Sequence, residues 1–316
     1  QSSADLKGTA LRFGFELYVA PITGDGDAAE AIDQVLASSD LIIATFDREA
    51  YKPATMKWLL YLAFQQQRPI IGFSQALLRA GAKVMIWSRS QESVDAALEK
   101  FNEVPGSEGC VAGLRVDAGS EDEVERALQE TISSCGAPDI LINGVGGNIG
   151  KYPLIEQDME LFEKVLHMNL VAGLMIPTKV FGRYWIENQI KGSIINLTSM
   201  ASYNPLSGVW AYDAAKSATL NLTMASANEF AEHGIRVNAI APGFFLGKQN
   251  RALLVDQETG EYTERGKAVI AHTPYGRFGD VKELAGATVF LASDSAAGFV
   301  TGVSIPVDGG YLIHNI

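Results

Sequence analysis

The sequence predicts an α/β protein with a mostly parallel, doubly wound sheet that carries helices on both faces. Short apolar runs alternate along the chain with longer segments of helical periodicity, which is typical of parallel strands joined by helices. The 316 residues are 47% hydrophobic and 20% charged, an ordinary composition for a globular protein. No low-complexity stretch, linker or solenoid-like repeat interrupts the alternation. The length therefore predicts one large domain or two smaller ones.

The N-terminal elements form extra β-α-β units ahead of the main sheet. Each strand candidate is a short apolar run, and the helix candidate after it has apolar residues at helical spacing. Gly24-Asp25-Gly26-Asp27 opens the first helix as an acidic N-cap, because its two carboxylates would repel a phosphate. The strand candidates are 11–20, 41–46 and 69–73, and the helix candidates are 27–38, 54–66 and 74–81.

The same alternation continues to the C-terminus. Its longest loop candidate, 243–272, is rich in charge and glycine, and long loops in compact domains are often lids. The strand candidates here are 83–88, 111–116, 138–143, 192–198, 235–240 and 303–307, and the helix candidates are 91–103, 120–134, 156–187, 209–232 and 280–293.

The charge balance and the cysteine count exclude several classes of function. A net charge of −12 argues against a nucleic-acid binder and against docking to anionic lipid, although a local cationic cluster can still bind an anionic small molecule. Polar residues interrupt every apolar run, so no membrane span is expected. Cys110 and Cys135 are expected to be free thiols in a reducing, cytoplasmic setting, and no metal-ligand spacing is present.

Tyr212 and Lys216 are spaced to share one face of a helix. An ammonium beside a phenol stabilises the phenolate, and such a phenol can pass a proton to or from a carbonyl or alcohol oxygen. Ser199, 13 residues earlier, ends a strand candidate where open α/β sheets bind ligands. Asn169 interrupts an apolar helix pattern, either as a satisfied core amide or as a break that holds a proton-relaying water. A Tyr–Lys pair at this spacing also occurs by chance on the surface of helices, so the residues around it decide between a surface pair and a catalytic pair.

This arrangement resembles the short-chain dehydrogenase/reductase family over about 83–316, and the resemblance implies a Rossmann-like fold. The run 139–146 resembles the family's "NNAG" strand, 236–243 resembles its strand and "PG" turn, and 301–310 resembles its C-terminal strand. The resemblance implies an NAD(P)-dependent oxidoreductase that interconverts a carbonyl and a secondary alcohol. It implies Tyr212 as acid/base, Lys216 as the residue that tunes it, Ser199 as the substrate-positioning residue and Asn169 as the end of the relay.

The resemblance also implies a cofactor site, with one departure. The family's glycine-rich turn should lie near 69–75, where Gly72 is the one glycine, so we expect weak nicotinamide binding. Ser88 and Arg89 end the strand where an acidic residue is usual in NAD-binding members, which favours NADP over NAD. Asp117 resembles the residue beside the adenine. The other implied cofactor-binding residues are Asn143, Gly144, Gly146, Pro242 and Gly243.

Finer features are similar to reductases of hexuronate-derived keto sugar acids. They are Gly146-Gly147-Asn148, Ser199-Met200 and the long segment from Phe244 to Pro274. A carboxylate substrate needs cationic or amide partners. Asn148, Lys248 and Arg251 are the candidates, and solvated loop positions are the alternative for each of them.

The stretch 11–82 contains Ser39-Asp40-Leu41-Ile42-Ile43-Ala44, then Pro53-Ala54-Thr55 before a leucine-rich helix, and then Arg68-Pro69-Ile70-Ile71-Gly72-Phe73-Ser74. With these segments it resembles a different family, one lobe of an ABC-transporter solute-binding protein. We therefore predict a chimera of two domains, a flavodoxin-like or solute-binding-lobe-like segment at 1–82 and a dehydrogenase-like domain at 83–316; a divergent reductase with an N-terminal extension is the alternative. We expect one continuous sheet with 69–73 beside 83–88, and the alternative is a rebuilt sheet with 69–73 away from 138–143. The alternative to the oxidoreductase is a chimeric α/β protein that folds but has lost cofactor binding and turnover. By family habit, helices 156–187 and 209–232 pair between subunits in a homo-dimer or homo-tetramer.

Overall fold

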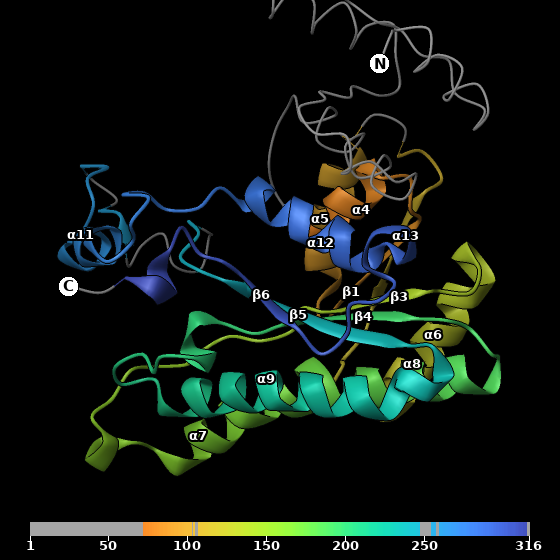
Figure 1. Ribbon diagram of the computed structural model, residues 1–316, viewed down its shortest axis with the longest axis horizontal. Coiled ribbons are helices and arrows are strands. Elements are labelled where there is room, and N and C mark those ends of the chain that lie inside the picture. Colours follow the sequence, from red (N-terminus) through yellow and green to blue (C-terminus); the bar gives the residue numbers. More distant parts are fainter. Residues whose placement is uncertain (1–71, 103, 105–106, 247–253, 257–258, 315–316) are drawn as a thin grey trace, which may run out of the picture. The chain divides into compact units, whose positions relative to one another are not determined.

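The computed structural model describes residues 72–102, 104, 107–246, 254–256 and 259–314 (Figure 1). All its labelled helices and strands belong to the unit Arg68–Ile316. The elements predicted at 11–20, 27–38, 41–46 and 54–66 lie outside the described residues.

Six described strands form two parallel sheets. The first sheet pairs β1 (Val84–Ser88) with β2 (Val111–Arg115). The second has the order β3-β4-β5-β6, so each strand lies beside its neighbour in sequence. The prediction of parallel strands joined by helices is confirmed. The strands of the second sheet are β3 (Ile140–Asn143), β4 (Ser193–Leu197), β5 (Arg236–Pro242) and β6 (Ser304–Val307).

The expectation of a strand at 69–73 inside one continuous sheet is wrong for the described residues. Gly72 and Phe73 open helix α4 (Gly72–Arg79), while 69–71 lie outside the described residues. Among the described strands, β1 and β3 share no hydrogen-bond ladder, although both contribute side chains to one apolar cluster. The error has a physical reason: periodicity alone cannot distinguish a short buried strand from the first turn of a buried helix.

Helices follow most of the strands, as expected. The predicted helix 156–187 is a continuous helical run from Met159 to Glu187, with a π-helical segment in its middle. The predicted loop 243–272 contains a helix, α11. After α4, the described helices are α5 (Gln91–Asn102), α6 (Glu121–Cys135), α7 (Met159–Leu166), the π-helical η2 (His167–Met175), α8 (Ile176–Glu187), α9 (Trp210–Phe230), α11 (Glu264–Ala271), α12 (Ala285–Ala292) and α13 (Asp294–Ala297). The described 3₁₀ turns are η1 (Leu154–Glu156), η3 (Met200–Ser202), η4 (Ala231–His233), η5 (Val281–Leu284) and η6 (Tyr311–Ile313).

The run Met159–Glu187 departs from the expectation that no apolar segment is long enough for a membrane. Its 29 residues have the length and composition of a membrane-spanning helix. However, 56% of its most apolar window is buried inside the protein, and Trp185 is fully enclosed. These are the properties of a core helix.

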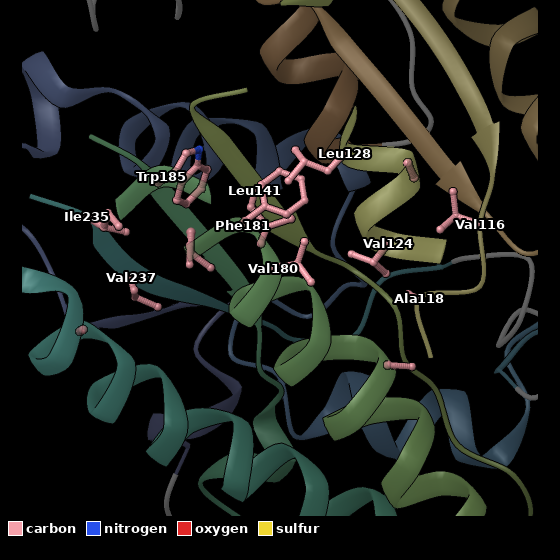
Figure 2. Close-up of a cluster of buried hydrophobic side chains, with 14 residues drawn as sticks. Val116, Ala118, Val124, Leu128, Leu141, Val180, Phe181, Trp185, Ile235 and Val237 are labelled. Carbon is pink, nitrogen blue, oxygen red and sulfur yellow. The ribbon is translucent and has the colours of Figure 1, made fainter. Parts of the chain in front are cut away.

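The two faces of the sheets are covered by different helices (Figure 1). Helices α6, α8 and α9 pack on one face, and α4, α5 and α12 pack on the other. The larger core lies under α6, α8 and α9, where Phe181 contacts both Trp87 and Trp185 at ring-centroid distances of 5.7 and 5.6 Å. Figure 2 shows this cluster, with Leu141, Ile235 and other aliphatic side chains around Phe181 and Trp185 of α8.

A line of polar side chains crosses this core. Asn143 on β3 and Asn196 on β4 are register partners, and the Asn143 amide donates to Asn196 Oδ1 at 2.8 Å. The Asn143 amide also donates to Thr178 on α8, and the Asn196 amide donates to Thr223 on α9, each at 2.9 Å. All four side chains are buried. This polar ladder connects two neighbouring strands to two helices on the same face.

Candidate active site

Tyr212 and Lys216 lie one turn apart at the start of α9, as the spacing predicts. The Lys216 ammonium is 5.6 Å from the centroid of the Tyr212 ring and donates to the carbonyl of Leu197, the last residue of β4, at 2.8 Å. Lys216 is buried, and burial lowers its pKa to about 8 from an ordinary value of 10.5. The ammonium is therefore held beside the phenol ring.

Ser199 lies two residues after β4, and its side chain lies close enough to the Tyr212 phenol to lower the pKa of that group. Its hydroxyl also accepts the Ala201 N–H at 3.2 Å, which starts the turn η3. Burial raises the pKa of the Tyr212 phenol, the nearby Ser199 side chain opposes this rise, and the charge of Asp213 adds to it. The structure thus brings Ser199, Tyr212 and Lys216 together.

Asn169 lies in the π-helical segment η2 and is buried. Its amide donates to the carbonyls of Val165 and Gly147, both at 2.8 Å, and its Oδ1 accepts the Gly147 N–H at 3.1 Å. The side chain is therefore satisfied, and it fastens the loop after β3 to the helix. Single π-helical turns inside α-helices are frequent at functional sites.

Gly146 connects Asn169 to Lys216. A Cβ on Gly146 would lie 2.6 Å from Asn169 Oδ1 and 3.4 Å from Lys216 Nζ. The loop after β3 thus passes against both relay candidates, and a side chain at this position would displace Asn169.

Most predicted cofactor residues lie at the carboxyl ends of parallel strands, where open α/β sheets bind ligands. Ser88 ends β1, the exposed Arg89 follows it, and Asp117 follows β2. Pro242 is the last residue of β5, and the Gly243 that follows packs so closely on Asp308 that a Cβ would lie 2.6 Å from its Cα. Gly144 is exposed after β3, and Gly72 is the first residue of α4.

Asn143 and the predicted substrate residues fall in other places. The Asn143 amide is engaged in the polar ladder, so this side chain lies in the core. Asn148 is exposed, and its amide donates to the carbonyl of Gly150 at 2.6 Å. Lys248 and Arg251 lie outside the described residues.

Two further residues near Tyr212 were not expected from the sequence. The Ser202 hydroxyl donates to the carbonyl of Lys216 at 2.6 Å, and Asp213 Oδ1 accepts the Leu206 N–H at 3.1 Å. A carboxylate in the first turn of a helix is a visible sequence signal, but its partner seven residues earlier is not.

Comparison with known proteins gives the family. The protein-family model described as "Enoyl-(Acyl carrier protein) reductase" matches residues 71–312. The chain belongs to the short-chain dehydrogenase/reductase family. It is 39% identical over 259 residues to an uncharacterized oxidoreductase, UxuB, of Bacillus subtilis, which covers 77% of this chain and 90% of the relative.

Solved short-chain dehydrogenase/reductase structures are similar along the same stretch. One is a putative D-mannonate oxidoreductase from Haemophilus influenza with bound NAD, at 32% identity and a TM-score of 0.69, covering 77% of this chain and 90% of that chain. Another is a gluconate 5-dehydrogenase from Burkholderia cenocepacia in complex with NADP and tartrate, at 31% identity and a TM-score of 0.67, with the same coverage. Both of these solved structures thus hold a nicotinamide cofactor.

The described residues fit such a cofactor. Gly146 brings bare backbone against Asn169 and Lys216, where a Cβ would lie 2.6 Å from Asn169 Oδ1, and the exposed Arg89 directly after β1 has no ion pair in the described part of the chain. Metal chemistry has no comparable support: among the described residues, no three His, Cys, Asp or Glu side chains are grouped to hold an ion. Cys110 and Cys135 are free thiols.

Proposed function

We propose that the chain is an NAD(P)-linked oxidoreductase that interconverts a carbonyl and a secondary alcohol on a sugar acid or a related polyol. The observation that carries the proposal is the cluster in which the Tyr212 phenol lies beside Ser199, which lowers its pKa, and beside the Lys216 ammonium. The substrate class is supported by relatives named gluconate 5-dehydrogenase and D-mannonate oxidoreductase.

In this proposal each residue of the cluster has one task. When bound, the nicotinamide supplies or accepts the hydride. Tyr212 gives its phenolic proton to the carbonyl oxygen during reduction and takes it back during oxidation. The Ser199 hydroxyl holds that oxygen beside the phenol. Lys216 stabilises the phenolate. Asn169 completes the relay by holding a water that passes protons to Lys216, and its side chain also bonds the loop at Gly147.

We assign the cofactor to residues at the carboxyl ends of the strands and prefer NADP. Arg89 is an exposed cation where a 2′-phosphate would need one, next to the uncharged Ser88. Asp117 is placed beside the adenine, and Gly72, Gly144, Gly146, Pro242 and Gly243 line the backbone path. Asn143 acts from the core, since its amide is engaged there. The substrate carboxylate is assigned to Asn148, Lys248 and Arg251.

The second candidate is a chimeric α/β protein that folds but no longer catalyses the reaction. Two observations favour it: β1 and β3 share no ladder among the described strands, and the sequence before α4 holds no glycine-rich turn. The N-terminal sequence resembles one lobe of a solute-binding protein. Because residues 71–82 belong to the family match, we place the fused segment before residue 71.

Fluorescence titration with NADPH, followed by turnover assays on a panel of sugar acids and polyols, separates the two candidates. We expect weak binding, with an affinity poorer than low micromolar (about −8 kcal/mol), together with measurable turnover. In any such turnover, Tyr212→Phe should lower the rate at least about a hundredfold, the usual scale of a lost general acid. Binding without turnover, or no binding at millimolar NADPH, would support the chimera instead. Turnover unchanged by Tyr212→Phe would contradict the proton-transfer assignment.

We further propose that the protein is cytoplasmic and forms a homo-dimer or homo-tetramer. Exposed apolar side chains on the paired helices support the assembly, among them Met159, Val171, Met175 and Met224. Sedimentation of the intact chain tests it, with a monomer at micromolar concentration as the contrary result.

A further inference from the structure

The loop between Ser199 and Tyr212 determines whether these two side chains can meet. It leaves β4, forms η3 and returns to α9. Two bonds fasten it to that helix: Ser202 donates to the carbonyl of Lys216, and Leu206 donates its N–H to Asp213. The Ser199–Tyr212 contact therefore depends on residues that are not themselves in the cluster.

Asp213 is an unusual residue to find at this place. Its side chain is 9% exposed, and its Oδ2 is buried without a hydrogen-bond partner among the described residues. Burying a carboxylate with so few partners is costly, and burial raises the pKa of Asp213. The first turn of a 21-residue helix offsets part of that cost through the helix dipole. A neutral side chain would be more stable here, which points to a role beyond folding.

The loop that Asp213 fastens is hydrogen-bonded to a second loop, the segment after β3. The Gly208 carbonyl accepts the Tyr152 N–H at 3.0 Å, and the Trp210 indole donates to the Tyr152 carbonyl at 2.9 Å. Gly208 has a φ of +76°, and a Cβ there would lie 2.9 Å from Lys151 Cγ. The segment after β3 thus lies directly on the segment that Asp213 fastens.

We infer that Asp213 is a positioning residue, whose carboxylate holds Leu206 and thereby sets the loops after β3 and β4 relative to Tyr212. Two effects follow from one side chain. The hydrogen bond fixes the loops, and the negative charge acts on the neighbouring phenol, whose other charged neighbour is Lys216. Asp213 itself is not assigned a contact with substrate.

Two substitutions separate these effects, given the turnover of the proposed function. Asp213→Asn keeps an acceptor for Leu206 but removes the charge that raises the Tyr212 pKa. Its KM should stay within about threefold of the wild-type value, while the pH profile of alcohol oxidation moves to lower pH. Asp213→Ala loses the acceptor as well, so its KM should rise at least about tenfold. An unchanged KM in Asp213→Ala, or an equal rise in both variants, would overturn the inference.

Hydrogen exchange followed by mass spectrometry gives a readout that needs no turnover. Peptides covering 203–208 and 147–153 should exchange at least about tenfold faster in Asp213→Ala than in the wild type, and at the wild-type rate in Asp213→Asn. Asp280→Ala is the control, because Asp280 also accepts a backbone N–H, from Lys282 at 3.0 Å, but outside both loops. If Asp213→Ala fails to fold, Ser202→Ala takes its place in the experiment. This variant removes the other fastening bond, so it should accelerate exchange at 203–208.

These measurements distinguish a failure of the proposed function from a failure of the positioning role of Asp213. Absence of turnover in the wild type would count against the proposed function and leave the exchange experiment valid. Exchange that is equal in Asp213→Ala, Asp280→Ala and the wild type would refute the positioning role, whatever the activity.

Discussion

Gly146→Ala should weaken both the stability of the fold and the relay, because the new Cβ has no room. It would lie 2.6 Å from Asn169 Oδ1, a separation that real Cβ atoms essentially never show. Asn169 is buried and bonded to Val165 and Gly147, so it cannot rotate away without losing bonds. The bonds at risk are the two to Gly147.

The size of the effect follows from those two bonds. Each neutral hydrogen bond contributes about 0.5–1.5 kcal/mol net, so their loss should lower the free energy of unfolding by about 1–3 kcal/mol. In a domain of this size each kcal/mol changes Tm by about 2–4 °C. Lys216 Nζ, 3.4 Å from the added methyl, would be in van der Waals contact with it.

Gly144→Ala is the matched control, because a Cβ at Gly144 has nothing within 4 Å. Thermal and urea unfolding of both variants, followed by circular dichroism, measures the difference. We expect Gly144→Ala to have the same Tm as the wild type and Gly146→Ala to have a Tm several degrees lower. Equal transitions for the two variants would show that Asn169 yields without cost, and the close approach at Gly146 would then have no energetic meaning.

Two more predictions use the electrostatics. Lys216 has a pKa of about 8 in the folded chain and 10.5 ordinarily, so the unfolded state binds more protons between these values and stability should rise with pH across that window, by up to about 3 kcal/mol. Lys216→Met should abolish this rise, as urea unfolding at pH 7.5 and 10 would measure; a rise that persists would assign it to other groups. Arg89→Ala should weaken NADP(H) more than NAD(H), because only NADP(H) carries the 2′-phosphate, and equal losses in parallel titrations would exclude Arg89 as its partner.

The sequence predicted the parts of the site that depend on local spacing. Tyr212 and Lys216 are one turn apart on a helix, and Ser199 follows a buried strand, so their elements could be found from periodicity alone. The start of α4 at Gly72 could not, because the apolar run before it reads equally well as a strand.

Other features depend on contacts between distant segments. The π-helical turn at Asn169 has no local signature, and it lies where Gly173 lets the backbone of Val145 approach. The role of Asp213 depends on Leu206, which joins it only through the path of a loop. Asn143 was assigned to the cofactor by resemblance, whereas its amide bonds Asn196 in the core.

The polar ladder has a consequence for how accurately the site is built. Asn143 lies three residues before Gly146, and Asn196 lies three residues before Ser199. A slip of one residue between β3 and β4 would turn one amide to the opposite face of the sheet and leave buried polar atoms unpaired, at about 1–3 kcal/mol for each. Apolar side chains alone would tolerate such a slip more easily. The two asparagines therefore fix the register of β3 against β4. This register sets where the loops of Gly146 and Ser199 leave the sheet, and so how each loop is placed relative to Tyr212.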